Sequence, residues 1–263
     1  MTAYALDHVA IALPAWAPAG PVLAGALGGR WVHGLRTPDL NTCQIQYGND
    51  TRVELLEPGP DPDSFVRRFL RDGRPRPHHI TFKVADIAHS LAATRAAGIE
   101  PILVHLEYGD WKEAFLHPRD TGLGFLAQLV QATMEPAEIY PEGLTPAPWP
   151  EPDGVPQTEL RSIVAHVPDL ATPRRVLAEI LGGTEEPCAA ADGWEARRFT
   201  WPSGAALILA RADDLPDGAG IRYLGVGPSA PRGLPVTPLP GGCVRTEPIA
   251  ELGVALLAPG NVP

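Results

Sequence analysis

The sequence has little of what marks a membrane, disulfide-bonded or nucleic-acid-binding protein. No apolar run approaches the roughly 20 residues that a membrane-spanning helix needs, and the N-terminus lacks the basic and apolar regions of a signal peptide. The three cysteines, Cys43, Cys188 and Cys243, are odd in number and widely spaced, which argues against a disulfide framework and fits a reduced cytosol. The net charge of −10 disfavours nucleic acid and anionic membranes as partners. We therefore expect a cytoplasmic monomer or homodimer that acts on a small-molecule substrate.

Proline divides the chain. At 263 residues, with 44% hydrophobic side chains, the sequence is long enough for two ordinary domains with packed cores. The segment 140–157 is dense in proline, which cannot donate to a strand ladder and which breaks helices, so an extended spacer is predicted there. We accordingly expect one domain at 1–138, a Pro-rich linker at 139–157 and a second domain at 158–263.

An internal repeat relates the two domains. LDHVAIALP at 6–14 matches LRSIVAHVP at 160–168, and VLAGALGG at 22–29 matches VLAEILGG at 176–183. Both matches share one offset of 154 residues, as the starting positions show. Two separate elements with a single offset indicate a duplicated strand and helix, with Gly-Gly closing each helix.

The strand and helix patterns extend this repeat. The first domain is predicted to contain strand 7–13, helix 18–27 and strands 41–47 and 52–57, then strand 79–84, helix 87–97 and strands 111–117 and 124–130. The second domain starts in the same way, but after its strand at 221–226 the proline-rich segment 228–242 stands where a helix would be. We therefore expect an α+β fold of tandem βαβββ modules.

Alternation within the strands puts four polar residues on equivalent faces. Successive strand residues point to opposite faces. In each of four strands one face is uniformly apolar and is expected to pack under helices, while the other is mixed and carries one candidate, namely His8, Glu54, His79 or Gln128. His78 points away by the same alternation, so His79 is the preferred member of that pair. Four such faces brought together would line a cup.

Four segments carry a resemblance to a known family. They are DHVAIALP (7–14), VELLEP (53–58), HHITFKVADI (78–87) and FLHPRDTGLGFLAQLVQ (115–131). They resemble the vicinal oxygen chelate superfamily, which includes glyoxalase I, methylmalonyl-CoA epimerase, extradiol dioxygenases and bleomycin-resistance proteins, and most closely its epimerase-like branch. The resemblance covers residues 5–132 well and 160–260 weakly. It implies a cup-shaped mixed sheet and two glyoxalase-like domains fused as a pseudo-dimer, the second of them degenerate.

The resemblance also implies a metal site with His8, Glu54, His79 and Gln128 as ligands. Two imidazoles, a carboxylate and an amide oxygen suit a divalent Zn, Ni, Co, Mn or Fe ion, which would polarise a carbonyl or enolate. The chain departs from the epimerases at two places. They usually carry a carboxylate where Gln128 stands, and an acid/base carboxylate on the second strand, where NTCQIQY at 41–47 has none.

Three functions follow as alternatives. The first is a metal-dependent lyase or isomerase acting on a small oxygenated acid, ketone or acyl thioester, with Glu113, a metal-activated water or a displaced Glu54 as its base. Thr81 and Lys83 share the face of His79 and would contact the substrate, although Glu113 and Lys83 are also typical of a solvated rim. The second is an Fe(II)-dependent ring-cleaving dioxygenase, which uses two histidines and one carboxylate. The third is a non-catalytic binding or resistance protein.

The second domain offers no comparable ligands. The positions that correspond to the four candidates are interpreted as Ser162, Leu207, Arg222 and Leu257. Three of these side chains do not bind metals well and the fourth repels cations, so a structural role is predicted for this domain.

A basic cluster precedes His78 in the first domain. It consists of Arg67, Arg68, Arg71, Arg74 and Arg76. In an acidic protein it could hold a phosphate or carboxylate, for example a CoA tail. Because charge runs are usually solvated faces, the sequence favours an exposed surface whose buried side is formed by Phe65, Val66, Phe69 and Leu70.

Overall fold

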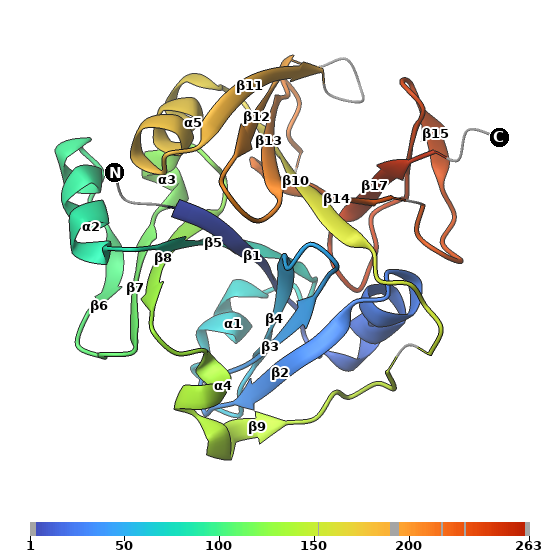
Figure 1. Cartoon of the computed structure of the whole chain (residues 1–263), viewed down its shortest axis with the longest axis horizontal. Coiled ribbons are helices and arrows are strands. Elements are labelled where there is room, and N and C mark those ends of the chain that lie inside the picture. The colour runs from blue at the N-terminus through green and yellow to red at the C-terminus, as the bar shows by residue number, and fades with distance from the viewer. Residues whose placement is uncertain (1–3, 152, 190–194, 217, 229, 261–263) are drawn as a thin grey trace. The chain divides into compact units, whose positions relative to one another are not determined.

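The computed structural model describes residues 4–151, 153–189, 195–216, 218–228 and 230–260, and it divides into two compact units. Unit 1 consists of residues 1–8, 79–134 and 162–222, and unit 2 of residues 9–78, 135–161 and 223–263. Each unit therefore contains segments from both halves of the sequence. The colours of Figure 1 mark the position of each segment along the chain. Among the described residues, no helix is long and apolar enough to cross a membrane.

Two βαβββ modules make up the first half of the chain. The first consists of β1 (Tyr4–Ala12), η1 (Ala17–Ala19), η2 (Pro21–Ala26), β2 (Arg30–Arg36), β3 (Leu40–Gln46) and β4 (Arg52–Pro58). The second consists of β5 (Arg76–Val84), α2 (Ile87–Ala96), β6 (Ile102–His105), β7 (Trp111–Leu116), α3 (Pro118–Thr121) and β8 (Leu126–Ala132), and α1 (Phe65–Phe69) separates the two modules in the chain. The predicted strands and helices are present, with ends that differ by a few residues.

Two strands of these modules, β2 and β6, were not predicted, because the geometry of each is locally irregular. β2 shifts its register against β3 between Trp31 and His33, so its side chains do not alternate regularly. β6 is four residues long and includes Leu103 at a φ of 49°, where side chains are rarely found. Both irregularities hide the period of two on which strand prediction depends.

Each unit contains strands from two sheets. In unit 1 the neighbouring strands follow the order β6-β7-β8-β5-β1 in one sheet and β11-β12-β13-β10 in the other. In unit 2 the orders are β1-β4-β3-β2-β9 and β14-β17-β16-β15. β5 and β8 run parallel and place Thr81 opposite Gln128, while β3 and β4 run antiparallel and place Gln44 opposite Glu54. The predicted α+β fold of tandem, fused modules is confirmed.

The second half repeats this plan and then loses a helix. Its elements are β10 (Glu159–Val167), α5 (Ala171–Arg175), η4 (Val176–Ile180), β11 (Thr184–Ala189), β12 (Glu195–Thr200), β13 (Ala206–Arg211), β14 (Gly220–Gly227), β15 (Thr237–Leu239), β16 (Cys243–Arg245) and β17 (Ala255–Pro259). The described part of 228–242 forms no helix, as its prolines predict. Gly28 and Gly182 follow η2 and η4 at φ of 65° and 64°, which confirms that the two Gly-Gly pairs close the repeated helices.

The Pro-rich segment is more structured than predicted. It begins after α4 (Pro136–Ile139) and contains η3 (Pro141–Gly143) and β9 (Leu144–Thr145), and β9 pairs with β2. The prediction that this stretch can form neither helix nor strand ladder was therefore wrong. Proline is tolerated in the first turn of a helix, and Leu144 and Thr145 keep their backbone donors. Further along, Trp149 lies edge-on to Trp31, with ring centroids 5.3 Å apart. The boundaries of the two domains stay a prediction.

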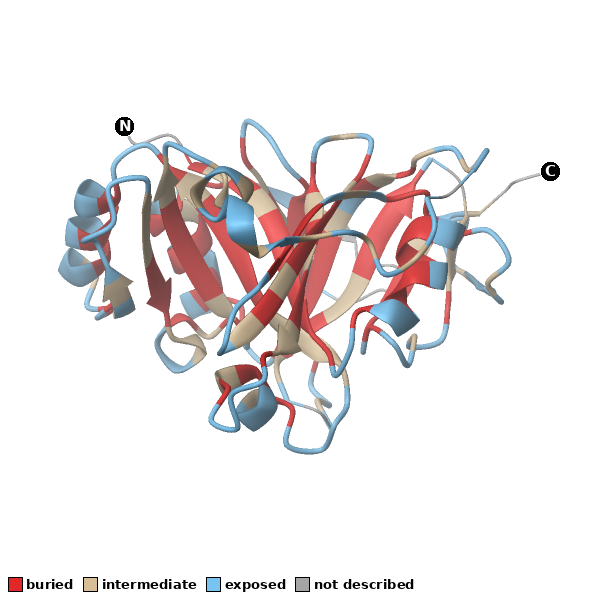
Figure 2. Ribbon diagram, turned by 90° about the horizontal axis from the view of Figure 1, so that it is seen from below, coloured by how far each residue is buried: buried red, intermediate tan, exposed pale blue. Residues whose placement is uncertain are grey.

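The cores lie along the strands, as Figure 2 shows by the buried residues that run along them. In unit 2 the mixed face of β1 and β4 does not stay open along its length. Ala10, Ala12 and Leu56 follow His8 and Glu54 on that face and pack in one cluster with Val66 and Leu70, at α1 and the residue after it. α1 therefore covers part of the face that the sequence assigns to the cup.

Candidate metal centre

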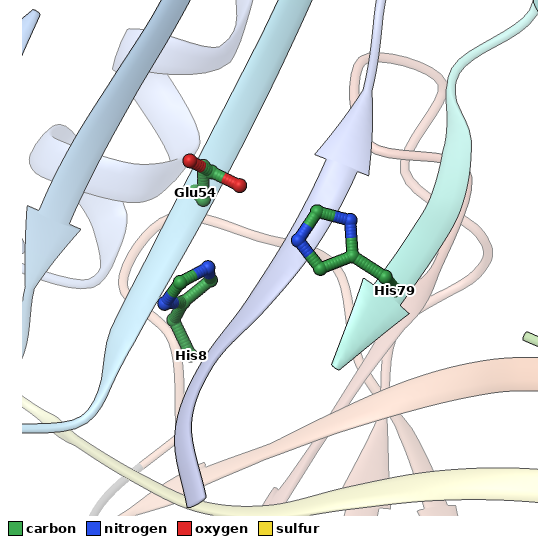
Figure 3. A group of neighbouring side chains, drawn as sticks. All are labelled: His8, Glu54 and His79. Carbon is green, nitrogen blue, oxygen red and sulfur yellow. The ribbon is translucent and has the colours of Figure 1, made fainter. Parts of the chain in front are cut away.

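The structure brings three of the four predicted ligands together. One ligand atom each from His8 on β1, Glu54 on β4 and His79 on β5 lies within 4.8 Å of the others, and Figure 3 shows the three side chains pointing toward one another. Among the described residues this is the one group of three or more histidine, cysteine or carboxylate side chains so arranged. The two histidines are 2% and 4% exposed, and Glu54 is half-buried. By contrast, His78 packs against the rings of Phe65 and Phe69.

His8 is oriented by a carboxylate and a lysine. Its Nδ1 lies 2.7 Å from Oδ2 of Asp7, and Nζ of Lys83 lies 3.2 Å from the other oxygen, Oδ1. A carboxylate on one ring nitrogen fixes the tautomer in which that nitrogen carries the proton, and this leaves Nε2 as the donor to a metal. The ammonium of Lys83, predicted to meet the substrate, neutralises Asp7 in this structure.

Gln128 belongs to a hydrogen-bonded chain within unit 1. Oγ1 of Thr81 lies 2.8 Å from Nε2 of His8 and donates a hydrogen bond to Oε1 of Gln128. At its other end, Nε2 of Gln128 donates to Oε2 of Glu113 over 2.8 Å, and the indole of Trp111 donates to the same oxygen over 3.1 Å. The hydroxyl of Thr81 has one proton for two acceptors. A cation bound to Nε2 of His8 would occupy that acceptor, and the hydroxyl would then donate to Gln128 alone.

Glu54 is held from its own sheet. Oγ1 of Thr42, on β3, donates to Oε1 of Glu54 over 2.7 Å. The neighbouring Cys43 is fully buried, and burial, with the charge of Glu54 second in effect, raises the pKa of its thiol well above the usual value. Cys43 therefore stays a protonated thiol, which is a poor metal ligand.

The donor set fits a divalent transition metal. Two imidazoles and one carboxylate are borderline ligands that suit Zn, Fe, Co, Ni or Mn. A second shell is also present, since Asp7 and Thr42 each bond a ligand and fix its orientation. Three protein ligands leave positions on the ion for substrate oxygens. The residues present therefore match what such an ion requires.

Sequence reasoning missed the residues that support the ligands. Asp7 precedes His8 in the strand, so strict alternation assigns its side chain to the opposite face, yet its carboxylate reaches the imidazole. Thr42 acts through Glu54 from a neighbouring strand, and no spacing in the sequence relates that pair. Two signals were available: Trp111 lies two residues before Glu113 on one strand, and an Asp-His pair stands at the start of β1, where a ligand histidine commonly bonds a carboxylate.

No such group is found among the described residues of the second half, and the register of its strands corrects one proposed correspondence. β14 and β17 pair in parallel with Gly225 opposite Leu257, as Thr81 lies opposite Gln128. If Leu257 corresponds to Gln128, the residue two before Gly225 corresponds to His79, and that residue is Tyr223 rather than Arg222. Ser162, Leu207 and Leu257 still offer no such ligand set beside this tyrosine, so the interpretation of the second half as structural is unchanged, and we call it the silent copy.

Comparisons with known proteins agree with this fold. Residues 7–115 match the family model of the Glyoxalase/Bleomycin resistance protein/Dioxygenase superfamily. The match falls on the part of the chain whose sequence resembles that superfamily. No curated protein matches the chain.

Solved structures show how far the likeness extends. A mutant of 4-hydroxymandelate synthase from Streptomyces coelicolor is 14% identical, with a TM-score of 0.66 over 98% of this chain and 93% of that chain. A fusion of a xylose isomerase-like TIM barrel with 4-hydroxyphenylpyruvate dioxygenase is 13% identical, with a TM-score of 0.64 over 98% of this chain and 49% of that chain. Methylmalonyl-CoA epimerase from Mycobacterium tuberculosis is 24% identical over 51% of this chain and 91% of its own, with a TM-score of 0.44. At these identities the likeness concerns the fold alone.

Proposed function

We propose that this protein is a metal-dependent enzyme that chelates adjacent oxygens of its substrate. The reaction proposed is that of a lyase or isomerase on a small oxygenated acid, ketone or acyl thioester. One observation carries the proposal: the ligand atoms of His8, Glu54 and His79 lie within 4.8 Å of one another, and their histidines are buried. Two imidazole nitrogens and a carboxylate that converge in this way form a donor set that suits a divalent transition-metal cation. A cytoplasmic location, and a monomer or homodimer, are part of the same proposal.

His8, Glu54 and His79 would hold the ion, with Gln128 as the proposed fourth ligand. A divalent ion bound there would supply Lewis acidity toward a carbonyl or enolate oxygen. Asp7 keeps the imidazole of His8 in the tautomer that binds metals, and Thr42 keeps the carboxylate of Glu54 in place. These contacts reduce the reorganisation that binding a metal or a substrate would otherwise require.

A lyase or isomerase also needs a group that takes and returns a proton. Glu54 and Glu113 are the proposed candidates. Glu54 is one of the three converging ligand residues, and Glu113 accepts a hydrogen bond from Gln128. Thr81 is fully buried and bonded to Gln128, so its proposed contact with the substrate would be made inside the site rather than at its rim. The side chain of Lys83 is 32% exposed and is the better placed of the two to attract an anionic substrate.

A second candidate function starts from the same residues. Two histidines and one carboxylate are the ligand set of non-haem Fe(II) oxygenases. This composition favours an Fe(II)-dependent ring-cleaving dioxygenase as the alternative. Oxygen consumption with a catecholic or enolic substrate by the Fe(II)-loaded protein, and none with the Zn-loaded protein, would select it. Turnover without oxygen uptake would select the lyase or isomerase.

The first test is the metal content of protein purified without chelators. We expect near-stoichiometric metal in the wild type and background metal in His79→Ala, because removing one of three close ligands abolishes a site of this kind. Tyr223→Phe, at the corresponding position of the silent copy, is the matched control and should keep the metal of the wild type. No metal in either protein after incubation with Zn, Ni, Co, Mn and Fe would refute the catalytic proposal and leave a non-catalytic binding protein.

A further inference from the structure

The turn between α1 and β5 borders an open cavity that none of the ligand residues named above lines. It has a volume of about 400 Å³ and is lined by Arg68, Phe69, Arg71, Asp72 and Arg76, which we call the arginine cavity. All five residues belong to unit 2. A concave space of a few hundred Å³ lies within the size range of small-molecule sites.

The arginine cavity carries a net positive charge. Asp72 forms an ion pair with Arg76 and so compensates one of three guanidinium groups. Arg68 donates to the backbone carbonyl of Asp63, which leaves its charge uncompensated. Arg71 makes no hydrogen bond or ion pair with any residue in the described part of the chain. Two positive charges therefore face one small space in a protein of net charge −10.

The walls of the cavity are fixed by packing. The ring of Phe69 lies edge-on to His78, with centroids 4.7 Å apart, and the guanidinium of Arg76 lies 5.7 Å from the centroid of the same ring. Val66 and Leu70 anchor α1 in the core beside these residues. Arg76, held in this way, loses less side-chain freedom when a ligand binds, whereas Arg68 and Arg71 are exposed.

Asp72 holds the turn itself. Its Oδ1 accepts from the backbone N–H of Arg74 over 3.2 Å and from Arg76. The hydrogen bond from Arg74, followed by the guanidinium of Arg76, holds the pKa of this carboxyl below its usual value. The carboxylate is therefore ionised at neutral pH and keeps Arg76 directed along the cavity wall.

We propose that the arginine cavity binds the phosphate group of a small molecule. Guanidinium groups match the oxygens of a phosphate in pairs, and a phosphate carries enough charge to use both uncompensated arginines. The local reversal of charge in an acidic chain also favours the approach of a small anion over that of a nucleic acid. The arginines at 67, 68, 71 and 74 are exposed while Val66 and Leu70 are buried, as the sequence predicts, and the proposed anion site lies on that exposed surface.

The test is a calorimetric titration of metal-free protein with inorganic pyrophosphate at low ionic strength, which measures the heat of binding. Dialysis against a chelator removes any metal that would bind the probe, and His79→Ala serves as a second metal-free sample. We expect saturable binding in both. Arg71→Gln should weaken it at least about fivefold, since this change removes a full charge but no hydrogen bond within the protein. Arg198→Gln, an exposed arginine paired with Glu186 on β12, is the matched control and should bind like the wild type.

Two results would overturn the proposal. One is a non-saturable response, or an equal response in wild type and Arg71→Gln, which would mean a general ionic effect. The other is succinate binding as tightly as pyrophosphate at the same ionic strength, which would mean a site for any small anion. Because the protein is metal-free, neither result bears on the proposed metal centre, and a failure to bind metal leaves this test intact.

Discussion

The strand pairs β5–β8 and β14–β17 have the same geometry and different chemistry. Both pairs are parallel, with Thr81 opposite Gln128 and Gly225 opposite Leu257. The ligand His79 lies two residues before Thr81, and its counterpart Tyr223 lies two residues before Gly225. In β5 and β8 this face carries His79, Thr81 and Gln128, whereas β14 and β17 offer Tyr223, Gly225 and Leu257. The opposite face is apolar in both copies, with Ile80 and Phe82 in one and Leu224 and Val226 in the other, all buried. The buried face preserves the pairing, and the site residues are free to change.

The first strands of the two halves differ in the same way. The offset of 154 residues relates Asp7 and His8 to Arg161 and Ser162. In the first half Asp7 bonds the imidazole of His8, while in the second Arg161 forms an exposed pair with Glu159. The silent copy has lost the ligand together with the residue that orients it. The contrast can be tested at both positions.

The largest effect is expected from Asp7→Ala. Loss of the carboxylate frees the ring of His8 and removes the partner of Lys83, so metal affinity should fall about 10–100-fold. Competition with a chromophoric chelator measures this change. Arg161→Ala, at the equivalent position of the silent copy, should leave the affinity unchanged. Equal losses in the two variants would mean that Asp7 acts on stability rather than on the site.

A smaller effect is expected at Glu113, where two substitutions separate two roles. If Glu113 positions Gln128, Glu113→Gln keeps an acceptor for the amide and should retain most activity, while Glu113→Ala leaves that amide without its acceptor and costs about 1–2 kcal/mol in the free energy of unfolding. If Glu113 is the base, both variants lose activity alike, since an amide takes up no proton. Activity assays and urea unfolding on both proteins, with Lys112→Ala as a neighbouring control, decide between the roles.

The smallest effect concerns the thiols of the two halves. Burial raises the pKa of both Cys43 and Cys188, so the thiolate fraction of each is depressed at pH 8 and grows only as the pH rises toward the raised value. Cys43 on β3 is inaccessible, whereas Cys188 on β11 is only partly buried. Iodoacetamide should therefore label Cys188 slowly, faster at higher pH, and should not label Cys43 in the native state. Peptide mass spectrometry after labelling at pH 7 and pH 9 measures both, and labelling of Cys43 at either pH would contradict its burial.

Much of the fold could be predicted because its signals are local. Alternating strands, two Gly-Gly pairs at one offset and a proline-filled gap each have a direct structural cause, and each is present in the structure. β2, β6 and β9 could not be predicted in the same way. The first two depart from regular alternation, and β9 is two residues long and exists because β2 offers it an edge.

The candidate site could be predicted as far as it depends on one ligand residue from each strand. Alternation placed His8, Glu54 and His79 on faces that the structure brings together. The supporting bonds were not predictable, because Asp7 departs from strict alternation and Thr42 reaches Glu54 from another strand. The cover that α1 provides over Ala10 and Leu56 also depends on tertiary packing, which a pattern along one strand does not contain.

Each compact unit combines segments from both halves of the chain, and this has a consequence for how the chain can evolve. A duplicated half that has lost its ligands is dispensable for chemistry, and deletion would normally follow. Here neither 1–138 nor 158–263 contains a whole unit, so removing the silent half would expose the apolar strand faces of the half that carries the ligands. The buried residues of the second half are therefore constrained by packing even where they supply no ligand.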